Sequence, residues 1–335
     1  MRSWSLRLAL SALVGMCIGP LVGTLNASAL LGPTICTDRT VTVCNLWVSS
    51  SGSDSNNGQS AATPFRSLQR ANDLLCSQTF LRRCTGIGKT VKVNIAAGTY
   101  PNASTVWTYS DPTYKTQIIG QGVVMDGRFS TDWGLHIAPR NARSNIQVFH
   151  IKWTRYLRGG MTIGEGDRNR IYGNTFTRIG SYYSKKPEVR AFAGIYLINN
   201  SNNSIERSVF VDILNTGSGY GNEHGLYIVH STHNRVTGST FSNVGGDPIR
   251  VRDGADYNTI SGNAFINSGY LGYIGDWRCL DTAVVTCPDG DESLSWNNSF
   301  TGNVLKSPHP WHKAAFKSRF CYDLRGWCPS ARIAG

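Results

Sequence analysis

Two stretches decide the fold of this chain: GIYLINNSNNSIERSVF at residues 194–210 and GLYIVHSTHNRVTGSTF at residues 225–241. Each begins with a short run in which every second residue is Ile or Leu. A turn rich in Asn and Ser follows, and then a second short run that ends in Phe. Alternation with a period of two is typical of β-strands, and no helical period is present. The two stretches therefore predict a repeated strand–turn–strand unit.

The repeat has one part of constant length and one of variable length. Tyr196 to Phe210 and Tyr227 to Phe241 each span 14 residues, whereas the distances between successive Phe residues are 34, 31, 24 and 35. A unit this short cannot bury its apolar face alone and must stack on its neighbours. The pattern predicts an all-β fold, a single-stranded right-handed parallel β-helix, in which the coils differ only in their insertions.

Looser copies of the unit lie around these two stretches, at residues 135–149, 161–176, 249–265 and, as a tail, 297–300. Stacked coils place equivalent turn residues in one column, so we expect coil-to-coil hydrogen bonds among Asn203, Asn234 and Asn258. The insertions follow the Phe of each unit and should all leave the solenoid at the same turn. They are expected to form the wall of any binding site: residues 180–193, 214–224 and 268–296.

The N-terminus has the three parts of a secretory signal peptide. Residues 1–7 carry two Arg and no acid, residues 8–25 are apolar, and Ala27-Ser28-Ala29 is a small-residue cleavage signal. Residues 1–29 are therefore expected to be removed, leaving a mature domain at 30–335. An uncleaved anchor helix is the alternative, which Gly residues and Pro20 disfavour because a span needs about 20 clean apolar residues.

The cysteines agree with export to an oxidising compartment. One of the nine, Cys17, lies in the signal, and the other eight fall into four close pairs. Such spacing predicts local disulfides that clip loops, whereas zinc binding is disfavoured because no CxxC is present. The predicted pairs are Cys36 with Cys44, Cys76 with Cys84, Cys279 with Cys287, and Cys321 with Cys328.

The charge balance favours an acidic partner. The chain has 33 basic and 21 acidic residues, a formal net charge of +12, and 24 of the basic residues are Arg. The planar guanidinium group suits carboxylates and phosphates. The composition excludes a coiled coil, a membrane bundle and a collagen-like fibre. No motif supports nucleic-acid binding, and the predicted export argues against it.

The N-terminal part resembles a known superfamily. Residues 47–58 (WVSSSGSDSNNG), 64–71 (PFRSLQRA) and 91–100 (VKVNIAAGTY) resemble the entry of the secreted pectate-lyase-like β-helix superfamily. There, a Gly-rich turn precedes an amphipathic capping helix and the first coil. Apolar residues at helical spacing place the expected helix at about 65–80, and residues 305–335 are expected to form a C-terminal cap or tail. The resemblance implies a secreted carbohydrate-active protein but no single reaction, because the superfamily includes lyases, hydrolases, epimerases and phage or adhesin surfaces.

Strand alternation separates inward from outward side chains. Those expected to point inward are Ile195, Leu197, Leu226, Ile228, Ile249 and Val251. An outward column is then expected at His136, Thr162, Tyr196, Tyr227 and Arg250, and a second at Ala138, Gly164, Ile198, Val229 and Arg252. Glu223, His224 and Asp247 lie just before strands, and Glu165, His230 and Asp253 just after them.

This grouping predicts a site for an acidic polysaccharide. In β-elimination from a uronate, a base removes the C5 proton, a cation neutralises the carboxylate and an acid protonates the leaving oxygen. His224 or Tyr227 could serve as base or acid, with Arg250 and Arg252 as the carboxylate clamp. The side chains expected to bind the remaining substrate are Tyr196, His136, Glu165, His230 and Asp253.

Structural explanations compete with each of these roles. The Tyr column could be stacking alone, and the two Arg residues could form surface ion pairs with Asp247, Asp253 or Glu223. His230 and His233 could be solvated turn residues.

The known enzymes of this superfamily are matched only in part. Its lyases commonly use a Lys or Arg base with Ca²⁺, but the central strands here have no Lys and no multi-Asp calcium set. Its polygalacturonase-like hydrolases carry N-x-D, D-D, G-H-G and R-x-K motifs. Glu223-His224-Gly225 and Arg250-Val251-Arg252 resemble only the last two of these. Asp289-Gly-Asp-Glu292 could bind Ca²⁺, with a solvated loop as the alternative.

The sequence therefore predicts a secreted, monomeric β-helix that binds an acidic polysaccharide and cleaves it by elimination. No membrane span is expected after signal cleavage, and no metal is assigned beyond the Ca²⁺ just named. A glycoside hydrolase that uses Glu223 and Asp247 as paired carboxylates is one alternative. A non-catalytic cell-surface or carbohydrate-binding β-helix is the other.

Overall fold

The computed structural model describes residues 36, 38, 40–78, 84–139, 143–189, 191–217, 221–270, 272–277, 287, 290 and 292–310. The chain divides into two units, Met1–Pro33 and Thr34–Gly335. The first unit, with the predicted signal peptide, lies outside the described residues, as does the predicted C-terminal cap beyond residue 310. The second unit carries the fold.

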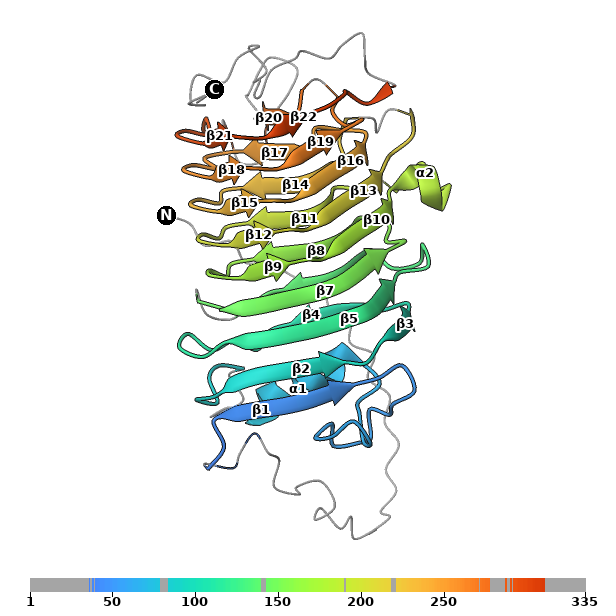
Figure 1. The fold of residues 1–335 in the computed structure, drawn as a ribbon, viewed down its shortest axis with the longest axis vertical. Coiled ribbons are helices and arrows are strands. Elements are labelled where there is room, and N and C mark those ends of the chain that lie inside the picture. The colour runs from blue at the N-terminus through green and yellow to red at the C-terminus, as the bar shows by residue number, and fades with distance from the viewer. Residues whose placement is uncertain are drawn as a thin grey trace, which may run out of the picture. The chain divides into compact units, whose positions relative to one another are not determined.

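The described part of the second unit consists mainly of short strands (Figure 1). Its N-terminal elements are β1 (Val43–Val48), α1 (Leu68–Gln78), β2 (Thr90–Ile95), β3 (Gly98–Pro101), β4 (Thr105–Trp107), β5 (Thr116–Asp126), β6 (Trp133–Ile137) and β7 (Ile146–Thr154). The central elements are β8 (Gly159–Gly164), β9 (Arg170–Tyr172), β10 (Thr175–Ile179), α2 (Ser181–Ser184), β11 (Ala193–Ile198), β12 (Ser204–Glu206), β13 (Val209–Ile213), β14 (His224–Val229), β15 (Arg235–Thr237) and β16 (Thr240–Val244). The last elements are β17 (Ile249–Arg252), β18 (Thr259–Ser261), β19 (Ala264–Ile266), β20 (Ile274–Trp277), β21 (Ser299–Thr301) and β22 (Val304–Leu305).

The strands wind into stacked coils, as Figure 1 shows. Three consecutive strands make one coil, such as β11, β12 and β13, and each pairs in parallel with its counterpart in the next coil. The first strands form a 7-stranded sheet in the order β20-β17-β14-β11-β8-β6-β4. The second and third strands belong to a 15-stranded sheet in which the long β7 pairs with both β9 and β10. The all-β parallel β-helix predicted from the repeat is confirmed.

A ladder of Phe rings fills one side of the core. Phe176, Phe210, Phe241 and Phe265 occupy one register position, and the rings of Phe210 and Phe241 stack with centroids 4.6 Å apart. Glycines face this ladder at the start of the 7-stranded sheet. A Cβ at Gly194 would lie only 2.7 Å from the Phe210 ring, so the constant spacing of Gly and Phe reflects close packing across the coil.

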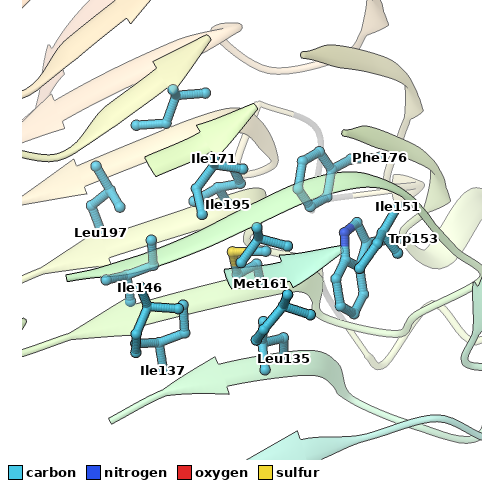
Figure 2. Close-up of a cluster of buried hydrophobic side chains, with 14 of the residues drawn as sticks. Leu135, Ile137, Ile146, Ile151, Trp153, Met161, Ile171, Phe176, Ile195 and Leu197 are labelled. Carbon is cyan, nitrogen blue, oxygen red and sulfur yellow. The ribbon is translucent and has the colours of Figure 1, made fainter. Parts of the chain in front are cut away.

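Aliphatic residues fill the other side of the core (Figure 2). Figure 2 shows Leu135, Met161 and Ile195 from the first strands in one cluster with Ile146 and Ile171 from the second sheet. The six side chains expected to point inward are all buried: Ile195, Leu197, Leu226, Ile228, Ile249 and Val251. Because strand register fixes which face a residue takes, this burial also fixes which residues face outward.

Asparagine side chains connect the turns, as predicted. The Asn234 Oδ1 accepts hydrogen bonds from the backbone N and the Nδ2 of Asn203, at 3.0 Å each. Asn234 in turn donates from the same two atoms to Oδ1 of Asn258, at 2.9 and 3.0 Å. The ladder also extends to Asn169 and Asn298. Buried backbone donors that face the next turn are thereby satisfied.

Three expectations about the repeat were wrong in detail. The run that ends in Phe is two strands, such as β12 and β13, and Phe210 is the second residue of the latter. Phe149 is not the ladder residue of its coil, because Trp153 pairs with Phe176. Residues 268–296 are not one insertion, because β20 lies within them and splits them between two different corners of the coil.

The N-terminal region has the predicted helix and two of the predicted disulfides. Leu68, Ala71 and Leu75 of α1 belong to the buried core. The Asn72 Oδ1 accepts hydrogen bonds from the backbone N–H groups of Thr108 (2.8 Å) and Tyr109 (3.0 Å). These contacts support the capping role, which stays a prediction. The two disulfides join Cys36 to Cys44 and Cys76 to Cys84.

Of the cysteines in the other two predicted disulfides, Cys287 is among the described residues, and it is disulfide-bonded. Cys279, Cys321 and Cys328 lie outside the described residues. Among the described residues, no helix is long and apolar enough to cross a bilayer.

Candidate functional site

The 7-stranded sheet carries the predicted outward column. His136 pairs with Thr162, Thr162 with Tyr196, Tyr196 with Tyr227, and Tyr227 with Arg250, each one coil further along. Gly164, Ile198, Val229 and Arg252 form the second column in the same way. Parallel strands about 4.8 Å apart therefore bring together residues that are far apart in sequence.

His224 opens β14 and is held in one tautomer. Its Nδ1 lies 2.8 Å from the backbone carbonyl oxygen of Asp247. A carbonyl oxygen only accepts, so Nδ1 carries the proton and Nε2 the lone pair. Burial, and then the nearby Arg250 cation, hold the pKa of His224 well below its usual value. The imidazole is therefore neutral at neutral pH, and its side chain lies edge-on to the Tyr227 ring at 5.0 Å between centroids.

Arg250 and Asp247 form an ion pair beside this imidazole. The pair joins Nη2 of Arg250 to Oδ2 of Asp247, which is fully buried. Arg250 itself is 8% exposed, as is Tyr227, and His224 is 3% exposed. The structure thus brings His224, Tyr227, Arg250 and Asp247 into one rigid cluster whose outer edge reaches the surface.

Arg252 joins the cluster through the Tyr227 hydroxyl. Its Nη1 donates to that hydroxyl at 3.0 Å, and its Nε lies 2.8 and 2.9 Å from the two carboxylate oxygens of Glu292. The expectation that Arg252 pairs with a carboxylate holds, but the carboxylate is Glu292 and not Asp247, Asp253 or Glu223. Arg252 of β17 therefore joins Glu292 to the Tyr227 hydroxyl and orients Tyr227.

Aromatic rings continue the column toward the N-terminal coils. Tyr196 stacks on Tyr227 with centroids 5.2 Å apart, and Trp133 stacks on both Tyr196 (6.4 Å) and Phe192 (6.5 Å). Burial, and then the neighbouring Tyr227, raise the pKa of Tyr196 to about 12, so its hydroxyl keeps its proton at neutral pH. Of these rings Phe192 is exposed, Trp133 and Tyr196 are partly buried, and Tyr227 is buried.

Trp133 and Phe192 were missed by the sequence analysis. A signal for Trp133 was present in Gly159, its register partner in the next coil. A Cβ at Gly159 would collide with the Trp133 ring, so the ring occupies space that only a glycine leaves. Phe192 lies in an insertion, where strand alternation gives no direction for a side chain.

Glu223 lies inside the coil and not in a groove. It is fully buried, and its Oε1 accepts a hydrogen bond from the Asn215 backbone N at 3.1 Å. Within the described part of the chain, its Oε2 has no hydrogen-bond partner. Burial raises the pKa of Glu223 to about 8, so the carboxyl is mainly protonated at neutral pH. Neither member of the proposed Glu223–Asp247 carboxylate pair is therefore exposed to a substrate.

Glu165, His230 and Asp253 lie where strands of the 7-stranded sheet end, apart from His136, which lies in the outward column. Glu165 and His230 line a polar pocket of about 470 Å³ together with Asp167, Asn199, Asn200 and Ser201. His230 Nε2 lies 3.0 Å from Oδ2 of Asp253. His136 contacts the Thr162 hydroxyl through Nδ1. These contacts join neighbouring coils and do not include His224.

Metal ligands do not gather in the described residues, where no group of three or more His, Cys, Asp or Glu side chains could hold an ion. Asp289 and Asp291 of the predicted Ca²⁺ loop lie outside those residues. Glu292, the last residue of that loop, is engaged with Arg252.

Comparison with known proteins agrees with the fold. Residues 117–265 match the family model described as "Right handed beta helix region". No curated protein matches the sequence. Similar solved structures include the pectate lyase Pel9A, with 10% identity, a TM-score of 0.48, and coverage of 86% of this chain and 81% of that one.

Two further structures are similar at the same level. The tailspike protein of E. coli bacteriophage HK620, in complex with a pentasaccharide, has 13% identity and a TM-score of 0.42, with coverage of 79% of this chain and 55% of that chain. The A-module of the Azotobacter vinelandii mannuronan C-5 epimerase AlgE4 has 10% identity and a TM-score of 0.35, with coverage of 74% and 70%. Likeness at this level says nothing of the reaction. The match over residues 117–265 and the stacked parallel coils agree on one fold, the right-handed parallel β-helix.

Proposed function

We propose that this protein is a secreted enzyme that cleaves an acidic polysaccharide by β-elimination at the His224–Tyr227–Arg250 cluster. The observation that carries the proposal is the tautomer of His224. A neutral imidazole with its lone pair on Nε2 is a base that is ready to accept a proton across the neutral range. The Arg250 guanidinium and the Tyr227 phenol lie beside this imidazole and supply a cation and an acid next to the base.

Each group has a distinct task in this reaction. His224 takes the C5 proton of a uronate, and the electron pair left behind forms the C4–C5 double bond while the C4–O bond breaks. The leaving oxygen takes a proton from the Tyr227 hydroxyl. Because Arg252 donates to the oxygen of that hydroxyl, the O–H of Tyr227 remains available to donate. The substrate carboxylate meets the exposed edge of Arg250, which stays paired with Asp247, and hydrogen bonding there makes the C5 proton more acidic.

The aromatic wall suits a sugar chain that runs along the coils. Tyr196 offers a protonated hydroxyl, and the edges of Trp133 and Phe192 offer apolar contact for sugar C–H groups. The stacked rings lose little conformational freedom on binding, because they already hold one another.

Hydrolysis by paired carboxylates is less well supported. Asp247 is fully buried and paired with Arg250, and Glu223 is fully buried on the Asn215 side. Two carboxyl groups that flank a glycosidic bond must both reach it.

Secretion rests on the N-terminal sequence together with the disulfides. The Cys36–Cys44 and Cys76–Cys84 bonds each close a short loop in the described structure. Such bonds persist in oxidising compartments. An N-terminal sequence of the mature protein that begins at residue 30 is the expected result.

The test is a digest of polygalacturonate, alginate and neutral glucan by the wild type and by His224→Gln, Tyr227→Phe and Arg250→Gln. The expected result is ultraviolet absorbance of a new C=C–carboxylate from an acidic polymer only, reduced about 100-fold or more in each variant. His233→Gln is the matched control, because His233 is an exposed turn residue stacked on Tyr257. New reducing ends without the absorbance would favour a hydrolase. Binding without either product would favour a non-catalytic binding protein.

A further inference from the structure

The free positive charge of the described solenoid does not lie in the candidate site. There, Arg250 is paired with Asp247 and Arg252 with Glu292. The second strands of successive coils, on the 15-stranded sheet, have a different balance. The outward residues of β9, β12, β15 and β18 are Arg170, Tyr172, Ser204, Glu206, Arg235, Thr237, Thr259 and Ser261.

One carboxylate is present among those outward residues, that of Glu206. Arg170 binds it through two hydrogen bonds, of 3.1 Å from Nε and 2.7 Å from Nη2. The Arg170 guanidinium holds the pKa of Glu206 below its usual value. Arg235 on β15 and Arg207, directly after β12, are both exposed. The guanidinium groups of Arg170, Arg207 and Arg235 and the carboxylate of Glu206 together have a net charge of +2.

Tyr172 positions two of these guanidinium groups. The Cζ of Arg170 lies 4.8 Å from the centroid of the Tyr172 ring, and that of Arg207 lies 5.8 Å from it. The Nη1 of Arg207 also donates to the Tyr172 hydroxyl at 3.2 Å. Cation–π contacts orient a guanidinium group without neutralising it, so the positive charge stays available to a ligand.

Register sets the direction in which a ligand would meet these cations. Arg170 pairs with Ser204, and Ser204 with Arg235, so the two Arg residues lie two coils apart on one line. That separation is about 10 Å along the solenoid. Hydroxyl groups of Ser204, Thr237, Thr259 and Ser261 accompany the cations. A polymer with carboxylates and hydroxyls along its length matches such a row.

We infer that Arg170, Tyr172, Glu206, Arg207 and Arg235 form a second binding surface, the arginine face, which holds an acidic polysaccharide along the coils, away from the His224 cluster. The occupant follows from charge complementarity and from the hydroxyl-rich surroundings, which suit sugar hydroxyls. The inference does not rest on the proposed reaction, because it concerns a different sheet and requires no bond to break.

The test compares two double variants that lose the same charge. Arg207→Gln/Arg235→Gln removes two cations of the arginine face and keeps the Arg170–Glu206 pair. Arg66→Gln/Arg178→Gln removes two exposed cations elsewhere. Both are made in the His224→Gln background, so that no polymer is consumed if the proposed reaction is correct, and a change in binding is separate from a change in cleavage.

Affinity for polygalacturonate is measured at increasing salt, with neutral dextran and duplex DNA as comparison ligands. At low salt, the arginine-face variant is expected to bind polygalacturonate about tenfold more weakly than the parent, with a weaker dependence of affinity on salt. The control variant is expected to show no comparable loss of affinity. Tyr172→Leu keeps every charge, and its affinity for polygalacturonate is expected to fall about threefold because the guanidinium groups are no longer oriented. Equal losses in the two double variants would overturn the inference, and so would equal binding of dextran or tighter binding of DNA.

Discussion

Gly225 lies directly against the ring of Phe241, sixteen residues further along the chain. A Cβ at residue 225 would come within 2.5 Å of Cδ1 of Phe241 and 2.9 Å of the carbonyl oxygen of Pro248. Gly194 has the same relation to Phe210. The constant length of each repeat therefore records a contact across the coil, where a first-strand glycine makes room for a third-strand ring.

Replacing this glycine should destabilise the fold. Gly225→Ala places a methyl group where the Phe241 ring and a backbone oxygen already lie. The neighbouring Phe210 and Phe265 rings hold Phe241 from both sides, so it cannot move away. We expect the free energy of unfolding to fall by about 1–3 kcal/mol. Urea denaturation followed by circular dichroism measures the change.

Gly164→Ala is the matched control, because this glycine also lies in the 7-stranded sheet but faces outward. The closest atom to a Cβ there is Cγ2 of Ile198, at 3.8 Å, an ordinary contact. Its stability should be within about 0.5 kcal/mol of the wild type. If both variants were equally stable, the Gly–Phe contact would not explain the repeat.

The asparagine ladder should be sensitive to the loss of one member. Asn234→Ala removes the oxygen that accepts from both the backbone N and the Nδ2 of Asn203, in a buried turn. Each orphaned donor costs about 1–3 kcal/mol. We expect a marked drop in the urea midpoint and faster amide hydrogen exchange at Asn203. Asn222→Ala, at an exposed residue, should change neither.

Strand alternation accounts for what the sequence predicts well. Ile195 and Leu197 alternate with Tyr196, and a period of two leaves no choice about which of them faces the core. The column from His136 to Arg250 could therefore be placed without a structure. The asparagine ladder could be predicted from the same register, because a turn of constant length repeats its side chains at the same point of each coil.

Residues outside the strands could not be placed in this way. Glu223 stands directly before β14, and no periodicity tells whether such a side chain turns outward or, as here, toward Asn215 inside the coil. Glu292 is forty residues from Arg252, and a long insertion gives no register to predict their ion pair. The strand β20 could not be predicted within residues 268–296, because a strand of only four residues shows too little alternation of apolar and polar side chains.

Glu223 makes the stability of the protein depend on pH. Its pKa rises from an ordinary carboxyl value in the unfolded chain to about 8 in the folded one, because the side chain is buried. The folded state therefore holds the proton more tightly, and stability is fully present below the unfolded pKa. It declines as the pH rises from about 4.5 to 8 and then levels off. Urea midpoints at pH 5, 6.5, 8 and 9 measure this decline.

Glu223→Gln tests the assignment. The amide cannot ionise, so this variant should lose the decline between pH 5 and 8 that belongs to residue 223 and should be the more stable protein at pH 9. A decline of the same size in the variant and the wild type would assign the pH dependence to another group.

His224 should set the acidic limit of activity below the usual range for a histidine base. Its pKa is lowered first by burial and then by Arg250, so the imidazole stays neutral as the pH falls through 6.5. We expect kcat/KM for the eliminated polymer to remain constant from pH 8 to below 6.5 and to fall only at lower pH. Arg250→Gln removes the nearby cation and should move that acidic limb upward, toward 6.5, as well as reduce the rate. The pH–rate profiles, together with the imidazole carbon shifts of His224 in NMR spectra, measure both effects. The proton acceptor would be a different group if the acidic limb of the wild-type pH–rate profile had its midpoint at or above pH 6.5. The same would follow if Arg250→Gln left that midpoint unchanged.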